Sequence, residues 1–278
     1  MRFPMRSNNI TFVIFTFNEE ARIARVIRNF VHAGKVLVVD NHSTDGTEEI
    51  ARTAGATVLK HKNPGWVEND NTVSLIKATV DTPWIYWAFA DEMIDQATVD
   101  VILAEIEVPG CSIVRIARKN YFYGVFCHDA FISSMNRVFR KDAIDFTGNE
   151  IHGFGRVTVP KKMITALDAK KHFVHHFISN TAKSYLGTID RYTDIEPKRS
   201  GSRPATRIIL TALKTFIFNY FVRKGYKAGL PGLFLLYQMI LYEAVLNMKR
   251  FEVSENLTAA NIEERNDEVR EGLLRGMR

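Results

Sequence analysis

Ile10-Thr-Phe-Val-Ile-Phe15 is a short apolar run of β-prone residues, and Lys35-Val-Leu-Val-Val-Asp40 is a second one. The residues between them, from Glu19 to Val31, repeat apolar side chains at helical spacing. A strand, a helix and a second strand in this order predict a βαβ unit.

The alternation of helix and strand continues beyond this unit. Further helices are expected at 45–54, 69–80 and 95–107, and further strands at 56–60 and 83–88. A capping box of Asp45 and Glu48 is expected to open the first of these helices. A β-rich segment at 111–140 then breaks the rhythm. The pattern predicts an α/β fold, with helices flanking a mostly parallel mixed sheet.

The composition is that of a folded protein in a reducing compartment. The 278 residues are 46% hydrophobic, which is enough for a substantial core. Two cysteines, Cys111 and Cys127, are too few for a disulfide framework. Residues 1–9 are polar and lead directly into the first strand, so we expect neither a signal peptide nor an N-terminal anchor.

The character of the chain changes at about Ser179. We expect amphipathic helices at 180–192 and 205–224, and a strongly apolar segment at 230–248 that carries Gln238 and Glu243. These two polar residues favour a helix on the membrane surface over one that spans it, with an ordinary core helix as the other alternative. The predicted domains are 1–178, in two halves at about 10–108 and about 109–178, a membrane-associating region at 179–251 and a charged tail at 252–278.

The net charge of +6 indicates an anionic partner, and its distribution indicates which kind. Basic residues recur from Lys198 to Arg250 among long apolar and aromatic runs. This is typical of an element that binds an anionic membrane surface. No recognised nucleic-acid-binding motif is present, so we expect no nucleic-acid partner.

Polar side chains follow three of the predicted strands at the edge where parallel strands end. They are Thr16-Phe-Asn-Glu-Glu20, Asp40-Asn-His-Ser-Thr-Asp-Gly46 and Phe89-Ala-Asp-Glu92. Asp40 and Glu19 suit the hydroxyls and N–H groups of a nucleoside, and Asp91 suits a divalent cation on a diphosphate. The turn from Ser43 to Gly46 can present backbone amides at a helix start, close to the bound phosphates or sugar.

A dinucleotide-binding fold is the competing nucleotide-binding interpretation. It requires glycines directly after the first strand, where the backbone approaches the pyrophosphate. No glycine occurs between Ile10 and Ala33. The sequence therefore favours a fold that holds a diphosphate through a metal ion.

These three clusters resemble the signature series of the family-2 inverting glycosyltransferases. Four downstream segments are similar to the branch that contains lipopolysaccharide-core glucosyltransferases: Arg118-Lys-Asn-Tyr-Phe-Tyr-Gly124, Arg137-Val-Phe-Arg140, Ile151-His152 and Gly229-Leu-Pro-Gly-Leu233. The resemblance extends from about Ile10 to Phe251. It implies a GT-A fold, a nucleotide-sugar donor and Mg²⁺ or Mn²⁺ bound by Asp91. It also implies a donor site formed by Thr16, Asn18, Glu19, Asp40, Ser43 and Asp45, so the half at about 10–108 is the donor half and the half at about 109–178 the acceptor half.

Three positions depart from the family pattern. Phe89 replaces the first metal carboxylate, Asp70 replaces a basic residue, and Gly153 follows His152 where a glutamate is expected. The catalytic base is therefore unresolved among Glu150, Asp129 and Glu92. On the acceptor side we expect His152, Tyr121 and Tyr123.

The three histidines at 172, 175 and 176 lack a matching Cys/His pair, so strand-end packing or acceptor contact is favoured over a zinc site.

The resulting hypothesis is an enzyme that transfers a sugar, from a UDP-sugar, to a lipid-linked or lipopolysaccharide-type glycan. It would work as a peripheral protein on the cytoplasmic face of the inner membrane. The rival hypothesis is a non-catalytic membrane-surface scaffold that keeps the fold without the first metal carboxylate.

Overall fold

The computed structural model describes residues 7–63, 69–149, 153–195 and 203–276. The chain divides into two compact units. The first consists of Met1–Tyr121 and Phe131–Ile178, and the second of Phe122–Ala130 and Ser179–Arg278.

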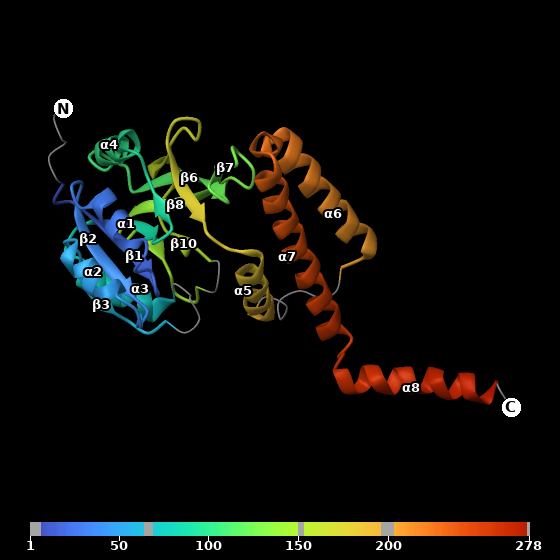
Figure 1. The fold of residues 1–278 in the computed structure, drawn as a ribbon. Coiled ribbons are helices and arrows are strands. Elements are labelled where there is room, and N and C mark those ends of the chain that lie inside the picture. Colours follow the sequence, from blue (N-terminus) through green and yellow to red (C-terminus); the bar gives the residue numbers. More distant parts are fainter. Residues whose placement is uncertain (1–6, 64–68, 150–152, 196–202, 277–278) are drawn as a thin grey trace. The chain divides into compact units, whose positions relative to one another are not determined.

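The first unit is built around four parallel strands in the order β3-β2-β1-β4 (Figure 1). The chain runs through β1 (Ile10–Thr16), α1 (Ile23–Phe30), β2 (Lys35–Asp40), α2 (Thr47–Thr53), β3 (Thr57–Lys60), α3 (Asp70–Thr79), β4 (Trp84–Phe89) and α4 (Gln96–Glu105). The strand order reverses direction between β1 and β4, because β2 and β3 lie on one side of β1 and β4 on the other. Ligands of such sheets bind outside the carboxyl ends of the strands at this reversal.

Both faces of this sheet are buried. On one face Phe12, Val38 and Tyr86 pack against apolar residues of α1 and α4. On the other face Val13 and Trp87 pack against residues of α3 and the segment that follows β8. Since neighbouring strand residues point to opposite faces, burial on both sides explains why β1 and β2 read as continuous apolar runs.

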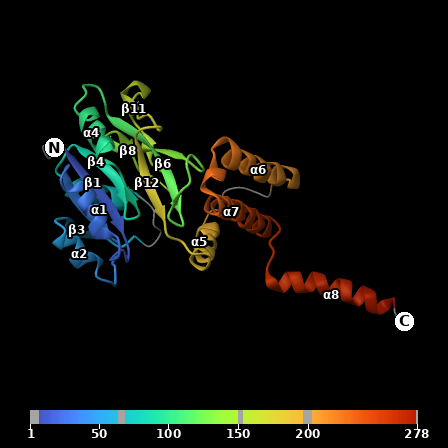
Figure 2. The same ribbon diagram turned by 45° about the horizontal axis from the view of Figure 1, so that its top comes forward.

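The sheet continues past β4 with a mixed half (Figure 2). The order beyond β4 is β8 (Ser133–Arg140), β6 (Ile113–Phe122), β12 (Phe173–Ile178) and β5 (Glu92–Met93), and β11 (Ile164–Ala166) and β7 (Val125–Phe126) pair with β6. A short 3₁₀ helix, η1 (Lys161–Met163), precedes β11, and β9 (Ile144–Asp145) pairs with β10 (Arg156–Val157) in a separate two-stranded sheet. Strand β12 runs antiparallel to β5, so His176 pairs with Glu92.

Two helix starts differ from the expectation. Helix α1 begins at Ile23 rather than Glu19, and α2 begins at Thr47 with Gly46 as its N-cap and no side-chain cap. The predicted capping box of Asp45 and Glu48 is therefore wrong. The cause is tertiary, because residues 18–20 and 43–47 form hydrogen bonds with one another instead.

The second unit is helical from residue 179 onwards. It contains α5 (Ala182–Ile195), α6 (Ala205–Ile217), the π-helix η3 (Phe218–Val222), the 3₁₀ helix η4 (Gly225–Ala228), α7 (Leu230–Ser254) and α8 (Ala259–Arg275). The charged tail is thus largely a helix, which opens with a capping box of Thr258 and Asn261. Within the described residues, the segments Ala205–Val222 and Leu230–Ser254 have the length and apolar composition of a membrane-crossing helix.

Candidate functional site

Asp40, at the end of β2, is fully buried and held by three hydrogen bonds. Thr16 donates from Oγ1 to Oδ1 of Asp40 over 3.2 Å. Ser43 donates from its backbone N to Oδ2 over 2.9 Å and from Oγ to Oδ1 over 2.5 Å. The loops after β1 and β2 are therefore joined through this carboxylate.

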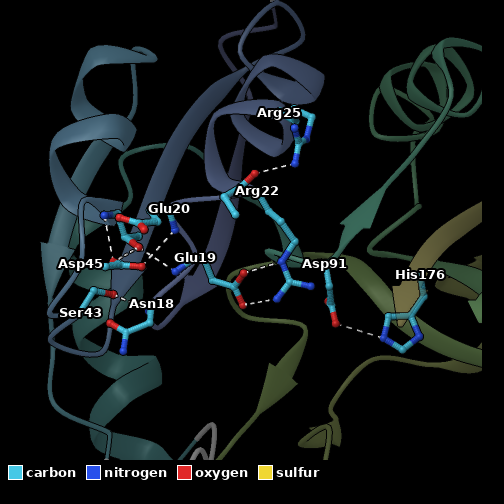
Figure 3. A network of polar contacts seen from close by, with 11 residues as sticks. Asn18, Glu19, Glu20, Arg22, Arg25, Ser43, Asp45, Asp91 and His176 are labelled. Atoms are coloured by element: carbon cyan, nitrogen blue, oxygen red, sulfur yellow. Dashed lines mark hydrogen bonds and ion pairs between the residues drawn. The ribbon is translucent and has the colours of Figure 1, made fainter. Parts of the chain in front are cut away.

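Asn18 and Ser43 form a second link between these loops (Figure 3). The backbone N of Asn18 donates to Oγ of Ser43 over 2.8 Å, and the backbone N of Thr44 donates to Oδ1 of Asn18 over 2.8 Å. Asn18 has a φ of 54°, in the left-handed region that asparagine tolerates better than most residues. These hydrogen bonds join the segments that follow β1 and β2.

Asp45 completes the link between the loops. Its Oδ1 accepts from the backbone N of Thr47 over 3.0 Å and from Oγ1 of Thr47 over 2.5 Å, and its Oδ2 accepts from the backbone N of Glu20 over 3.2 Å. Desolvation works to raise the pKa of Asp45, but these hydrogen bonds outweigh it and leave the pKa below its usual value. Asp45 is thus an ionised carboxylate that joins the two loops through hydrogen bonds.

Glu19 forms a bidentate ion pair with Arg22, the residue before α1. Nε of Arg22 lies 2.6 Å from one carboxylate oxygen of Glu19, and Nη2 lies 2.7 Å from the other. Figure 3 shows Arg22 between Glu19 and Asp91. The pair places a guanidinium group beside the predicted donor and metal residues.

Asp91 follows β4 and contacts His176 of β12. Nε2 of His176 lies 3.2 Å from Oδ2 of Asp91, and Nδ1 of His176 lies 2.8 Å from Oδ1 of Asn120 (Figure 3 shows the first contact). Desolvation raises the pKa of Asp91. The hydrogen bond from His176 and the positive charges of His176, Arg22 and Arg118 lower it by more, so the pKa lies below its usual value. Asp91 is therefore a carboxylate, and its side chain is 32% exposed.

Glu92 points away from solvent into a buried ion-pair network. Its Oε1 accepts from Nη2 of Arg137 over 2.6 Å and from Nη1 of Arg118 over 3.5 Å. Arg137 also donates to the carbonyl of Trp87, and its guanidinium carbon lies 5.3 Å from the ring centroid of Phe89. Since Glu92 is 1% exposed and already ion-paired, the geometry argues against it as a base that must reach an acceptor hydroxyl.

Alternation along the strands separates Tyr121 from the Asp91–His176 pair. Asn120 contacts His176, whereas the next residue, Tyr121, places its hydroxyl 3.0 Å from Nδ1 of His175 and stacks its ring on Phe177. Neighbouring residues of a strand face opposite sides of a sheet. Tyr121 therefore lies on the other face from the predicted metal residue, and its acceptor role stays a prediction.

The structure does not test the remaining predicted acceptor and base residues. Tyr123 and Asp129 belong to the segment that groups with the second unit. Glu150 and His152 lie outside the described residues. Their assigned roles stay predictions.

The family model named Glycosyl transferase family 2 matches residues 11–155, which is just over half of the chain and includes the loops, Asp91 and Glu92. The chain belongs to glycosyl transferase family 2. The predicted family is therefore confirmed, and so is the predicted GT-A type of α/β fold with its mixed sheet and flanking helices.

Curated relatives of this family-2 chain include an uncharacterized glycosyltransferase of Rickettsia typhi, 41% identical over 93 residues, which are 33% of this chain and 30% of that protein. Protein RfbJ of Shigella flexneri is 44% identical over 55 residues, which are 19% of this chain and 43% of that protein. The matches thus span about a third to a half of the relatives' own length.

Two solved structures show more distant likenesses. S. aureus TarS 1-349, in complex with UDP-GlcNAc, is 12% identical, with 89% of this chain and 90% of that chain covered and a TM-score of 0.48. Glucosyl-3-phosphoglycerate synthase of Mycobacterium tuberculosis, with Mn²⁺ and UDP, is 22% identical, with 42% and 45% covered and a TM-score of 0.33. These likenesses are too distant to assign a ligand to this family-2 chain.

The chemistry of Asp91 and His176 fits a divalent cation. With its proton on Nδ1, the neutral ring of His176 has a lone pair on Nε2, and this nitrogen and the carboxylate oxygen 3.2 Å away could then bind one ion in place of the proton. Among the described residues, no group of three or more His, Cys, Asp or Glu side chains could hold a metal. A bound cation would therefore need further ligands from a diphosphate or water, which is how Mg²⁺ is usually bound beside phosphates.

Sequence reasoning placed Asp91 in the site but did not place His176 there. The signal was weak, because His176 is one of two adjacent histidines in an aromatic strand, with a third histidine just before it. Its contact with Asp91 joins residues 85 positions apart and depends on the antiparallel pairing of β12 with β5. The sequence also did not indicate that Arg22 and Arg137 belong to the site.

Proposed function

We propose that this chain is an inverting glycosyltransferase that moves a sugar from a UDP-sugar to a glycan carried by a lipid or by a lipopolysaccharide-type molecule. The observation that carries the proposal is the Asp91–His176 pair, which lies at the carboxyl edge of the family-2 sheet near the loops after β1 and β2. This is where a sheet with this strand order binds its ligand.

The two linked loops are assigned to the nucleoside. Their internal hydrogen bonds hold Thr16, Asn18, Asp40, Ser43 and Asp45 in one arrangement before any donor arrives. A preorganised site loses less conformational entropy on binding. Glu19 is likewise assigned to the nucleoside, and the guanidinium group of Arg22, which Glu19 holds in an ion pair, would face the diphosphate.

Asp91 and His176 are assigned to Mn²⁺ or Mg²⁺. When bound, the cation would neutralise charge that develops on the departing diphosphate. The imidazole favours Mn²⁺, because Mg²⁺ prefers oxygen ligands. Asn120 would orient the ring of His176 through Nδ1.

The chemical step needs one base from the protein. An acceptor hydroxyl oxygen attacks the anomeric carbon on the side opposite the diphosphate, the bond from that carbon to the phosphate oxygen breaks, and the base takes the hydroxyl proton. One attack of this kind inverts the anomeric configuration. Asp129 and Glu150 are kept as candidates for the base.

The acceptor and the location rest on the second unit. Its exposed apolar helices and its basic residues fit a protein that works at the inner face of the cytoplasmic membrane, where lipid-linked glycans can be reached.

The test is donor binding and hydrolysis with a panel of nucleotide sugars, with and without Mn²⁺. The native chain is compared with Asp91→Ala and with the control His175→Ala, which changes the neighbouring histidine on the opposite face. We expect one UDP-sugar to be turned over only with metal, Asp91→Ala to abolish turnover, and His175→Ala to retain it. The anomer of the transferred sugar, read by NMR with a disaccharide acceptor, tests inversion.

The rival scaffold makes the opposite prediction. Phe89 stands where the family has its first metal carboxylate, so a scaffold without donor binding is the alternative to exclude. If no nucleotide sugar binds under any metal condition while the chain is folded, the transferase proposal is overturned.

A further inference from the structure

The positive charge of the chain is concentrated in one segment of the second unit. Residues 203–242 contain six Lys or Arg and no Asp or Glu, so this segment carries a charge of +6. The formal net charge of the whole chain is also +6, and the remaining residues are therefore balanced. The segment contains α6, η3, η4 and the first half of α7.

The same segment exposes large apolar side chains. Helix α6 has no buried residue, and only 6% of Ala205–Val222 is buried. Six side chains of α6 and η3 are between 41% and 64% exposed: Leu210, Leu213, Ile217, Phe218, Phe221 and Val222. Except for Phe221, they line an open depression together with Lys214. A monomeric soluble protein rarely leaves so many neighbouring apolar side chains in water.

Helix α7 also exposes large apolar side chains. Leu230, Phe234, Tyr237 and Leu241 are between 40% and 64% exposed and follow the spacing of one helical stripe. Its opposite side packs within the unit, where Leu235 and Leu236 are buried. The helix therefore has one packed side and one apolar stripe without cover in the described structure.

A tight turn joins α6 to α7 (Figure 1). A Cβ on Gly232 would lie 2.1 Å from the carbonyl oxygen of Gly225, and a Cβ on Gly225 would lie 2.8 Å from that of Asn219. Glycine is thus required at both positions for the backbones to approach. The segment between α6 and α7 carries the basic residues Arg223, Lys224 and Lys227. It also contains the exposed rings of Phe221 and Tyr226.

We propose that the hairpin of α6, η3, η4 and α7 binds the surface of an anionic membrane, with its apolar stripes among the lipid chains and its basic residues at the phosphates. Charge complementarity identifies the occupant, because residues 203–254 contain eight Lys or Arg against two Glu, and this net charge of +6 matches anionic headgroups. A second copy of the same hairpin would bring two positively charged surfaces together. This inference specifies the part and the lipid chemistry behind the proposed location, and it does not depend on transferase activity.

The hairpin fits the surface better than the interior of the bilayer. If both helices crossed the membrane, Arg223, Lys224 and Lys227 would be carried to the far side, against the usual retention of basic residues on the cytoplasmic side. Lys214 would lie within the hydrocarbon, as would Gln238 and Glu243. In a surface orientation, long basic side chains reach the headgroups while the apolar stripe is buried.

The experiment measures partitioning of the full chain onto vesicles by co-sedimentation. Vesicles of phosphatidylcholine are compared with vesicles in which about a third of the lipid is phosphatidylglycerol, at about 0.1 M and about 1 M salt. We expect binding to the anionic vesicles at low salt, and a large loss in high salt or on neutral vesicles. Equal binding to both vesicle types would overturn the role of the basic residues.

Two variants of the hairpin, each with a matched control, separate the contribution of the basic residues to vesicle binding from that of the apolar residues. Lys224→Gln with Lys227→Gln is expected to lower the partition coefficient about 25-fold, since each basic residue near such a surface contributes about a fivefold effect. Leu210→Ser is expected to lower it about tenfold or more through lost apolar burial. The controls are Lys183→Gln with Arg265→Gln, and Leu273→Ser in α8, where the leucine is 64% exposed as Leu210 is.

The controls and the oligomeric state decide the outcome. We expect the control variants to bind vesicles as the native chain does, and all variants to retain the same circular dichroism and the same UDP affinity. Equal losses in the control variants would overturn the assignment of the hairpin. A dimer in solution that Leu210→Ser dissociates, without vesicle binding by the native chain, would identify a second copy as the occupant instead.

Discussion

The two acidic clusters at the carboxyl edge of the sheet are built in different ways. In the loops after β1 and β2, Asp40 and Asp45 each accept three hydrogen bonds from the loops themselves. In the cluster after β4, Oε2 of Glu92 and Nε of both Arg118 and Arg137 are buried without a hydrogen-bond partner. Nearby, Asp91 is still 32% exposed.

This difference indicates that the carboxylates after β1 and β2 stabilise the fold, whereas the cluster after β4 is available to bind a ligand. Carboxylates whose hydrogen bonds are satisfied within their own loops stabilise a shape. In the cluster after β4, the partly exposed carboxylate of Asp91 and the imidazole of His176 remain within reach of a charged ligand. Variants in the two clusters are therefore expected to change different properties.

The largest expected effect is on stability, in the buried ion pair. Arg137→Met leaves the buried Glu92 carboxylate with only the longer contact to Arg118 and is expected to lower the free energy of unfolding by about 3–5 kcal/mol. Urea denaturation measures this loss. The double variant with Glu92→Gln is expected to be more stable than Arg137→Met alone, and a double variant that is no more stable would show that the pair is not the cause.

The next effect is on metal binding. His176→Ala is expected to weaken Mn²⁺ affinity about 10–100-fold, as measured by calorimetry with UDP present, with little change in stability. Its matched control is His175→Ala, which changes the adjacent histidine on the opposite face and is expected to leave Mn²⁺ affinity unchanged. Equal effects in the two variants would remove the distinction between the two faces of β12.

A smaller effect is expected in the linked loops. Asp45→Ala removes the acceptor for Thr47 and Glu20 and is expected to cost about 1–3 kcal/mol of unfolding free energy. Thermal unfolding checks this loss. Mn²⁺ affinity is expected to change less than in His176→Ala, and a greater loss of metal affinity than of stability would place Asp45 in the metal site rather than in the loop architecture.

The smallest expected effect is the pH dependence of the contribution that Asp45 makes to the free energy of unfolding. The pKa of Asp45 is lowered by folding, so its ionised form stabilises the folded state above its ordinary pKa of 3.8, and this stabilisation is lost as the pH falls towards the lower folded value. The difference in unfolding free energy between the native chain and Asp45→Asn is therefore expected to shrink on acidification below that pH. A difference that grows instead would reverse the sign of the shift.

Local sequence patterns were sufficient for the long parallel strands and most of the helices, and they predicted where the site lies. Continuous apolar runs marked β1 and β2, because a parallel strand buried on both faces needs apolar residues at every position. The polar residues after those runs marked the ligand edge, because parallel strands end at one edge of the sheet. The long apolar and basic segment likewise predicted the exposed helices of the second unit.

Only the tertiary structure decided which of those polar residues are used within the fold. Asp45 looked like a helix cap in sequence, yet it accepts hydrogen bonds that bracket two loops. Glu92 looked like a candidate base, yet Arg137 of β8 buries it in an ion pair. His176 became a partner of Asp91 through the register of two strands far apart in the chain. Local patterns reflect the period of a strand or a helix, whereas these contacts depend on which distant strands pair and in which register.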